Sequence, residues 1–212
     1  MQLYNSPKSP FGARVVIAAR VKGVDYEWLP IMGAELRAPA FRKVNPIGKI
    51  PVLLIDGEPV LPESETILRY LEDRFPEPSL MPASAEQRAR VNNLIRVADL
   101  YVMVPVIRLF AQLDPATRDQ RVVDYEVGYW TEGLAHLAQF MTAMPERPAA
   151  GLSLADCVLA PTFHLCRLIS GLLGLDDLLA PHPVITDYYA AILRHPVVGE
   201  VLTTLSEAQA GH

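Results

Sequence analysis

Two serines stand where helical patterns begin, and both suit the binding of a negatively charged group. Ser9 follows a strand-like segment and precedes Pro10, and Ser64 follows Glu63 in front of a helical pattern. The first N–H groups of a helix are unpaired and lie at the positive end of its dipole, so a hydroxyl there helps to hold a thiolate or a carboxylate. Glu63 would suit an ammonium group of the same ligand. For either motif alone, an ordinary helix cap is the simpler interpretation.

Pro51 stands at the start of the apolar run 52–55, where a strand is expected. Proline has no N–H for a sheet ladder and is kept to edges, bulges and first positions. A cis bond before it costs only about 0.5–1 kcal/mol, and it would turn the backbone N–H and C=O of Ile50 toward a cleft. An extended peptide could pair there as a short antiparallel strand. A trans proline at the first position of an edge strand explains the pattern equally well.

The first 75 residues alternate between strand and helix patterns. We expect strands at residues 2–5, 26–31, 52–55 and 59–61, and helices at residues 10–23, at residues 34–43 and from Ser64 onward. Two parallel strands joined by a helix, followed by an antiparallel pair, form a small α/β layer. Ligands of open α/β sheets gather at the C-terminal ends of strands beside helix N-termini. Ser9 and its neighbour Ser6 lie at such a position.

Strand patterns disappear after residue 75. Residues 76–83 are rich in proline and predict a linker, and residues 84–212 predict an all-helical domain. Pro105 lies inside a long apolar helical face and should kink or interrupt that helix. The spacing S-L-A-D at residues 153–156 precedes an apolar helix, which we expect Asp156 to cap.

Charge and composition argue against several classes of partner. The 19 Lys and Arg against 24 Asp and Glu give a net charge of −5, and no basic block occurs, so nucleic acid is not expected. We find neither an apolar stretch of about 20 residues nor a signal-peptide pattern, so we expect a cytoplasmic protein with no membrane partner. Cys157 and Cys166 form no metal-ligand pattern, so no metal is expected.

Four motifs together resemble the cytosolic glutathione transferases. They are S-P-F-G-A-R-V at 9–15, N-P-I-G-K-I-P-V-L at 45–53, E-S-x-x-I at 63–67 and S-L-A-D at 153–156. They occur in the order and spacing of that family, and the resemblance covers nearly the whole chain. It implies a thioredoxin-like α/β domain at residues 1–75 followed by the all-α domain at residues 84–212.

The resemblance also implies how glutathione, as co-substrate, would be held. In this family the proline at the position of Pro51 is cis, and the residue before it, here Ile50, pairs with the cysteinyl backbone of the tripeptide. Glu63 and Ser64 match the residues that hold the γ-glutamyl end.

The glycyl end and the sulfur are the remaining contacts. Arg37 lies near a position where some branches carry a lysine for the glycyl carboxylate, and Lys49 is a second candidate. Ser9 falls where the serine-type branches, among them tau, phi and zeta, carry a catalytic serine that donates a hydrogen bond to the sulfur. Ser6 is the alternative.

The activity implied is glutathione transfer, in which the thiolate attacks a small apolar electrophile. We expect the acceptor pocket to be lined by Phe11, Tyr101, Met103, Pro105 and Arg108. Pro10-Phe11-Gly12 replaces the longer serine- and cysteine-rich motif of the zeta isomerases, which argues against maleyl-type isomerisation. The family is dimeric, so a homodimer is expected. The alternative is a binding or adaptor protein that resembles the stringent starvation proteins and has no transferase activity.

Overall fold

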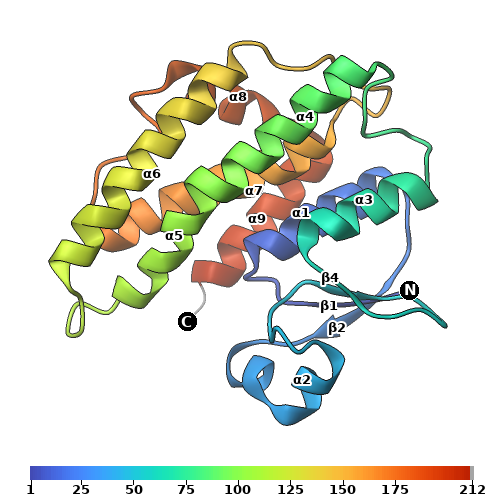
Figure 1. Cartoon of the computed structure of the whole chain (residues 1–212), viewed down its shortest axis with the longest axis horizontal. Coiled ribbons are helices and arrows are strands. Elements are labelled where there is room, and N and C mark those ends of the chain that lie inside the picture. Colours follow the sequence, from blue (N-terminus) through green and yellow to red (C-terminus); the bar gives the residue numbers. More distant parts are fainter. Residues whose placement is uncertain (211–212) are drawn as a thin grey trace.

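The computed structural model describes residues 1–210, and its N-terminal part contains a four-stranded mixed sheet (Figure 1). The strands are β1 (Gln2–Asn5), β2 (Glu27–Pro30), β3 (Val52–Leu54) and β4 (Leu61–Pro62), in the order β2-β1-β3-β4. β1 runs parallel to β2 and antiparallel to β3, which in turn pairs with β4. The βαβ unit followed by a hairpin, as the sequence predicted, is confirmed.

Helices cover both faces of this sheet. α1 (Pro10–Val21) and α3 (Ser64–Arg74) lie on the face toward the helical domain, and α2 (Pro39–Val44) lies on the opposite face (Figure 1). The single helix expected at residues 34–43 is two pieces, a 3₁₀ turn (Gly33–Arg37) and α2. Pro39 separates them because it is at the first helical position of α2, where a missing N–H costs nothing.

Side chains alternate between the two faces along the strands, as the pleat requires. Leu3 and Leu53 belong to the main hydrophobic core under the helical domain. Tyr4 and Val52, one position away, pack with Phe41 of α2 in a second, smaller cluster. One face of the sheet therefore packs in the main hydrophobic core, and the other face packs against α2.

The segment at residues 75–84, which joins α3 to the helical domain without helix or strand, is fastened to α1. Lys22 Nζ lies 2.7 Å from Glu72 Oε2 and donates to the carbonyl of Pro78 at 3.1 Å. Glu72 also accepts the N–H of Leu80 at 3.0 Å. The Lys22 side chain is 0% exposed and that of Glu72 is 9% exposed, so this ion pair is held inside the protein.

The rest of the described chain consists of helices and the loops between them. The helices are α4 (Ala85–Val97), α5 (Val104–Leu109), α6 (Gln120–Met141), α7 (Leu154–Leu173), α8 (Pro183–Ile192) and α9 (Pro196–Ala210). A π-helical segment (Ala98–Met103) joins α4 to α5, and Pro105 is the second residue of α5. The interruption predicted at Pro105 therefore takes the form of a π-helical turn just before it. Proline has no N–H and cannot donate the regular backbone hydrogen bond of an α-helix.

α7 is the central helix of this domain, and the predicted cap at its start is confirmed. Ser153 N–H donates to Asp156 Oδ2 at 2.6 Å, Ser153 Oγ accepts from Asp156 N–H at 3.4 Å, and Tyr188 donates to Asp156 Oδ1 at 2.7 Å. Among the residues described, α7 alone is long and apolar enough to cross a membrane. Its apolar window is 72% buried among the other helices, as expected of a core helix.

Candidate active site

A cavity of about 550 Å³ opens where the α/β layer meets α4 and α5. Its α/β wall includes Phe11, Lys49, Ile50, Pro51, Glu63 and Ser64. Its helical wall includes Arg96, Asp99, Met103, Ile107 and Arg108. Residues from four separate segments of the sequence therefore meet at one place, and most of the residues expected to contact glutathione are among them.

Asn45 holds the loop that brings Ile50 and Pro51 to the cavity wall. Its side chain is buried, donates from Nδ2 to the carbonyl of Lys49 at 2.8 Å and accepts the N–H of Ile47 at 3.1 Å. The Ile50–Pro51 peptide is cis, as the resemblance implied. β3 begins after Pro51, so Ile50 lies beyond the last residue pair of the ladder with β1.

The start of α3 has an unusual backbone conformation at Glu63. Its φ is 70° and its ψ is 116°, and it is the one non-glycine residue with positive φ in the described chain. Such a conformation costs an L-residue energy, and residues of this kind cluster at ligand sites. Ser64 follows directly and is 6% exposed, with its side chain at the cavity wall. No sequence pattern indicated this conformation.

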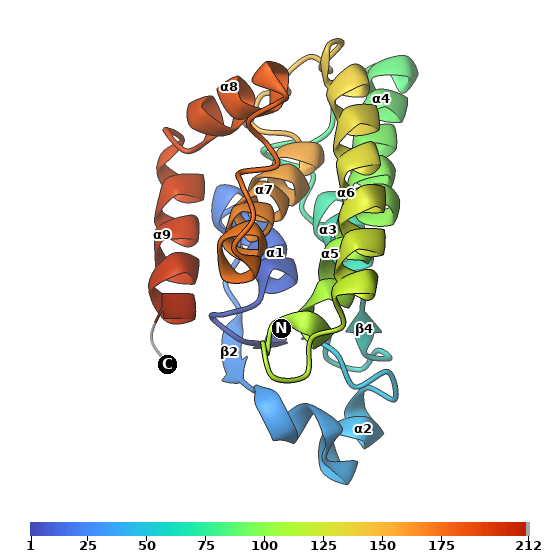
Figure 2. The ribbon, with the colours of Figure 1, turned by 90° about the vertical axis from the view of Figure 1, so that its left-hand side faces the viewer.

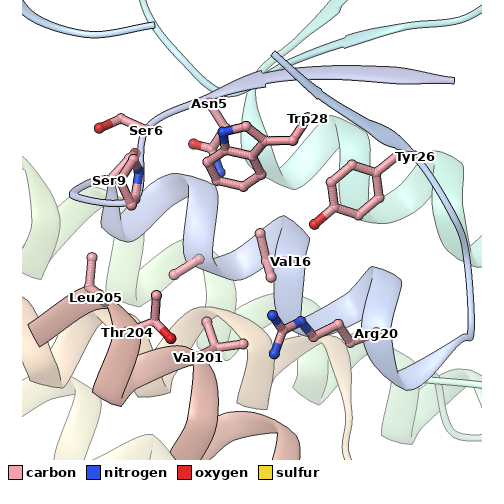
Figure 3. A pocket seen from close by; sticks show the side chains of 12 residues that line it. Asn5, Ser6, Ser9, Val16, Arg20, Tyr26, Trp28, Val201, Thr204 and Leu205 are labelled. Carbon is pink, nitrogen blue, oxygen red and sulfur yellow. The ribbon is translucent and has the colours of Figure 1, made fainter. Parts of the chain in front are cut away.

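Ser9 is the N-cap of α1, where its Oγ accepts the N–H of Gly12 at 3.0 Å. A hydroxyl that accepts a hydrogen bond keeps its own hydrogen to donate. Phe11 lines the main cavity, whereas Ser9 and Ser6 border a smaller hollow of about 120 Å³ between α1, β2 and α9 (Figure 3). Ser9 therefore caps α1 two residues before Phe11 and is not among the residues that line the main cavity.

A buried ion pair that the sequence did not indicate adjoins the cavity. Arg14 Nη1 lies 2.7 Å from Asp99 Oδ1, and Nη2 donates to Thr162 Oγ1 at 3.1 Å. The Arg14 side chain is 1% exposed, and its guanidinium lies 4.6 Å from the ring centre of Phe11. The pair joins α1 to the π-helical segment and α7, and thus fixes both Phe11 and Asp99 at the wall.

The expected acceptor pocket is divided between two hollows. Phe11, Met103 and Arg108 line the main cavity. Tyr101 and Pro105 instead line a hollow of about 480 Å³ against α6, which Arg108 also borders. The reason is the close approach of the π-helical segment to α6, where the carbonyl of Tyr101 packs against Gly133. Of the five residues expected to line the acceptor pocket, Tyr101 and Pro105 therefore do not border the main cavity.

The two basic candidates for the glycyl carboxylate are placed differently. Lys49 lines the main cavity, next to Ile50. Arg37 is exposed at the end of the 3₁₀ turn before α2, on the opposite side of the sheet from α3. The sequence left both candidates open because the length of this loop does not fix its direction.

Neither cysteine takes part in this site. Cys157 and Cys166 are free and buried on α7, and burial raises the pKa of the Cys166 thiol to about 12. Burial raises the pKa of Cys157 as well. Within residues 1–210, no group of three or more His, Cys, Asp or Glu side chains is arranged to hold a metal ion. Hydroxyl, carboxylate, ammonium and guanidinium side chains line the main cavity.

These features define a class of two-domain proteins, in which a thioredoxin-like layer and a helical bundle share a cavity beside a cis-proline loop. Residues 3–79 match the family described as "Glutathione S-transferase, N-terminal domain". The maleylacetoacetate isomerase of Pseudomonas aeruginosa is 30% identical over 211 residues, which cover 90% of this chain and 96% of that protein. Glutathione S-transferase Z2 of Arabidopsis thaliana is 31% identical over 170 residues, 77% of this chain and 75% of the relative.

Solved structures agree with this assignment. The holo structure of maleyl pyruvate isomerase, described as a bacterial glutathione S-transferase of zeta class, has a TM-score of 0.77 and 28% identity. The match covers 95% of this chain and 96% of that one. The chain therefore belongs to the glutathione S-transferase family.

Proposed function

We propose that the protein is a glutathione transferase that binds the tripeptide along the α/β wall of the main cavity. The proposal is carried by one observation: a strand end at Ile50 that extends beyond its ladder lies on the same wall as the N-terminus of α3. An extended peptide can add to such a strand end by backbone pairing. The first N–H groups of α3 and the Ser64 hydroxyl suit its γ-glutamyl carboxylate, and Glu63 suits its ammonium group.

The glycyl carboxylate is assigned in this proposal to Lys49. Lys49 lines the main cavity, whereas Arg37 lies outside it. Lys49 is followed directly by Ile50, so a peptide paired with Ile50 passes close to this cation. The charge of the lysine suits a carboxylate at that end of the tripeptide.

The sulfur is assigned to the Ser9 hydroxyl. Because Ser9 Oγ already accepts from Gly12, its hydrogen is free to point outward from the first turn of α1. A thiolate at that place gains one hydrogen bond and the favourable end of the α1 dipole. The thiolate is the nucleophile, so its stabilisation at neutral pH is the catalytic contribution of this serine.

The acceptor is assigned to the helical side of the cavity. Met103 and Ile107 supply apolar surface there, and Phe11 adds apolar surface from the α/β wall, which suits a small hydrophobic electrophile. Arg96 and Arg108 line the same cavity, and they favour a second candidate, a carboxylated acceptor that is isomerised with glutathione. Relatives named for maleylacetoacetate and maleylpyruvate isomerisation support that candidate, so the sequence argument against isomerisation needs a direct test.

A substrate panel assayed with and without glutathione tests the proposed function. We expect retention on immobilised glutathione and glutathione-dependent turnover of an electrophile such as an aryl halide, or of a maleyl-substituted acid. A folded protein that does not bind millimolar glutathione would contradict the proposal and favour the adaptor alternative. Turnover of maleyl acids alone would select isomerisation over conjugation.

Ser64→Ala should weaken glutathione binding by about 1.5–3 kcal/mol, because it removes a hydrogen bond to a charged carboxylate. Thr66→Ala is the matched control: it also removes a hydroxyl from the cavity wall, two residues further into α3. Calorimetric titration with glutathione measures both variants. Equal affinity of Ser64→Ala and wild type would place the γ-glutamyl end elsewhere.

A homodimer in the cytoplasm completes the proposal. Leu100, Tyr101, Tyr125 and Tyr129 form an exposed apolar patch around the hollow between α5 and α6, and such patches mark protein interfaces. This hollow shares Arg108 with the main cavity, so a second copy bound here would border the site. The two free cysteines are in keeping with a reducing compartment.

Sedimentation at micromolar concentration should give about twice the chain mass of 23.4 kDa. Tyr125→Glu should shift the protein toward the monomer, because an unpaired charge in an apolar interface is costly. Phe140→Glu, at an exposed aromatic near the far end of α6, is the control and should leave the mass unchanged. A wild-type protein of single-chain mass would contradict the dimer.

A further inference from the structure

Glu126 places a carboxylate on the buried face of α6. Its side chain is 8% exposed, and Val123, Trp130 and Leu134 belong to the same face. Burying an ionised carboxylate costs hydration energy, so a glutamate is rarely found at such a position without a partner. Figures 1 and 2 show α5 beside the first half of α6, so a counter-charge can come from that helix.

The partner of Glu126 is Arg108, on the last turn of α5. Arg108 Nη1 lies 3.3 Å from Glu126 Oε1 and donates a hydrogen bond to it. The second carboxylate oxygen, Oε2, is buried and has no hydrogen-bond partner within residues 1–210. The Arg108 side chain is 61% exposed, so the pair is open to solvent on one side. One such contact is weak compensation for a buried charge, which argues for a role beyond stability.

Arg108 lies at the boundary between the main cavity and the hollow against α6. Arg108 and Val104 line both spaces, whereas Glu126 lines only the hollow. The carboxylate of Glu126 therefore holds Arg108 from the hollow, while the arginine side chain also borders the main cavity.

The guanidinium of Arg108 has more donors than Glu126 uses. Arginine carries five N–H groups in a planar fork, and the hydrogen bond to Glu126 is made by Nη1 alone. The Nε and Nη2 groups remain for a second carboxylate, which a guanidinium binds best through two parallel hydrogen bonds. Arg108 can therefore be held by Glu126 and still bind a carboxylate in the main cavity.

We propose that Glu126 is a positioning residue, which holds the Arg108 guanidinium at this boundary so that it receives a carboxylate of the acceptor. The inference rests on the carboxylated acceptor of the proposed function. An exposed arginine has many rotamers, and ordering it when a ligand binds costs free energy. The buried carboxylate of Glu126 meets that cost in advance. Glu126 thus favours carboxylated acceptors, although it does not line the main cavity.

The test is calorimetric titration with succinate, an unreactive dicarboxylate, of the protein with and without saturating glutathione. Glu126→Gln, which removes the charge and keeps the shape, should weaken succinate binding by about tenfold. Glu126→Asp, which keeps the charge but withdraws it by one CH₂ group, should weaken it as well. Glu132→Gln is the matched control and should match wild type, because Glu132 borders the same hollow from α6 but has a 64% exposed side chain. The Kd for glutathione should stay within about twofold in all three variants.

A double-mutant cycle with Arg108→Gln separates the possible outcomes. If Glu126 acts through Arg108, Glu126→Gln should weaken succinate binding little further in the Arg108→Gln protein. Multiplicative losses would overturn the inference, as would wild-type affinity of Glu126→Gln for succinate or a wild-type protein that does not bind succinate. A wild-type protein that binds succinate but not glutathione would instead contradict the proposed function.

Discussion

Ser9→Ala is expected to lower turnover at pH 7 by about 10- to 100-fold, with a much smaller change in glutathione affinity. A free thiol has a pKa near 8.5, and one hydrogen bond together with the α1 dipole should lower it by about 1–2 units. The variant loses that stabilisation of the thiolate. In the proposed binding mode Ile50 and Ser64 still hold the peptide, so we expect the change chiefly in kcat and little in binding.

Ser84→Ala is the matched control for this change. Ser84 caps α4 as Ser9 caps α1, with its Oγ accepting the N–H of Gln87 at 3.2 Å. Both variants should lose about 1 kcal/mol of helix stability, but only Ser9→Ala should lose turnover. The rate of Ser9→Ala should partly return as the pH rises, because more of the thiol then ionises without help. Equal turnover of Ser9→Ala and Ser84→Ala at pH 7 would reduce Ser9 to a helix cap.

Glu72→Gln is expected to lower the free energy of unfolding by about 3–5 kcal/mol, because it leaves the buried Lys22 ammonium without its counter-charge. Domains are commonly stable by only about 5–15 kcal/mol, so urea denaturation should show the change clearly. Glu200→Gln, in the exposed pair with Arg20, is the control and should cost about 1 kcal/mol or less. A loss for Glu72→Gln no larger than that of the control would contradict the account of this ion pair.

Removing both charges should be milder than removing one. Lys22→Met with Glu72→Met leaves no unpaired ion in the interior and should recover much of the stability lost in either single variant. The pH dependence gives a second measurement. Burial opposes ionisation of Glu72, but hydrogen bonds from Lys22, Leu80 N–H and Ser79 outweigh it and lower the pKa below its usual value.

The sign of that effect follows from proton binding. Because the pKa of Glu72 is lower in the folded protein, the unfolded chain binds more protons as the pH falls below the ordinary glutamate value. Wild-type stability should therefore fall with decreasing pH through this window, down to the folded pKa. Glu72→Gln lacks the contribution, so its stability should depend less on pH there.

The order of strands and helices was predictable because it depends on local patterns. Alternating apolar residues, the prolines and Gly23 mark where elements begin and end, and the structure agrees to within a few residues. The second hairpin strand is displaced, at Leu61–Pro62 and not at residues 59–61. Pro62 is tolerated because β4 lies at the edge of the sheet, where the missing N–H breaks no second ladder.

The wall that presents Ile50, Glu63 and Ser64 was predictable for a different reason. Its residues lie in two compact motifs, at 45–53 and 63–67. The family resemblance predicts a cis peptide in the first motif, and the second motif predicts a helix N-terminus. The backbone of Glu63 was not predictable, because a positive φ at a non-glycine residue is imposed by the surrounding structure.

The sequence patterns did not predict the side-chain contacts between segments that lie far apart in the chain. Arg14 reaches Asp99 and Thr162, which are 85 and 148 positions away, and Gln209 reaches Lys8 across 201 positions. No periodicity within one helix encodes such pairs. Tyr101 was misplaced for the same reason, since the π-helical segment and its approach to Gly133 set the direction of that side chain.

Thiol activation in the proposed function depends on the Ser9 hydroxyl, which stabilises the thiolate of bound glutathione. The most direct measurement is the ultraviolet thiolate absorbance of glutathione bound to wild type and to Ser9→Ala, titrated against pH. We expect the thiol pKa of the wild-type complex to lie about 1–2 units below that of free glutathione, and the thiol pKa of the Ser9→Ala complex to lie close to the free value. Titration of both complexes at the same pH would contradict the claim and assign thiol activation to Ser6 or to the backbone N–H groups of the first turn of α1.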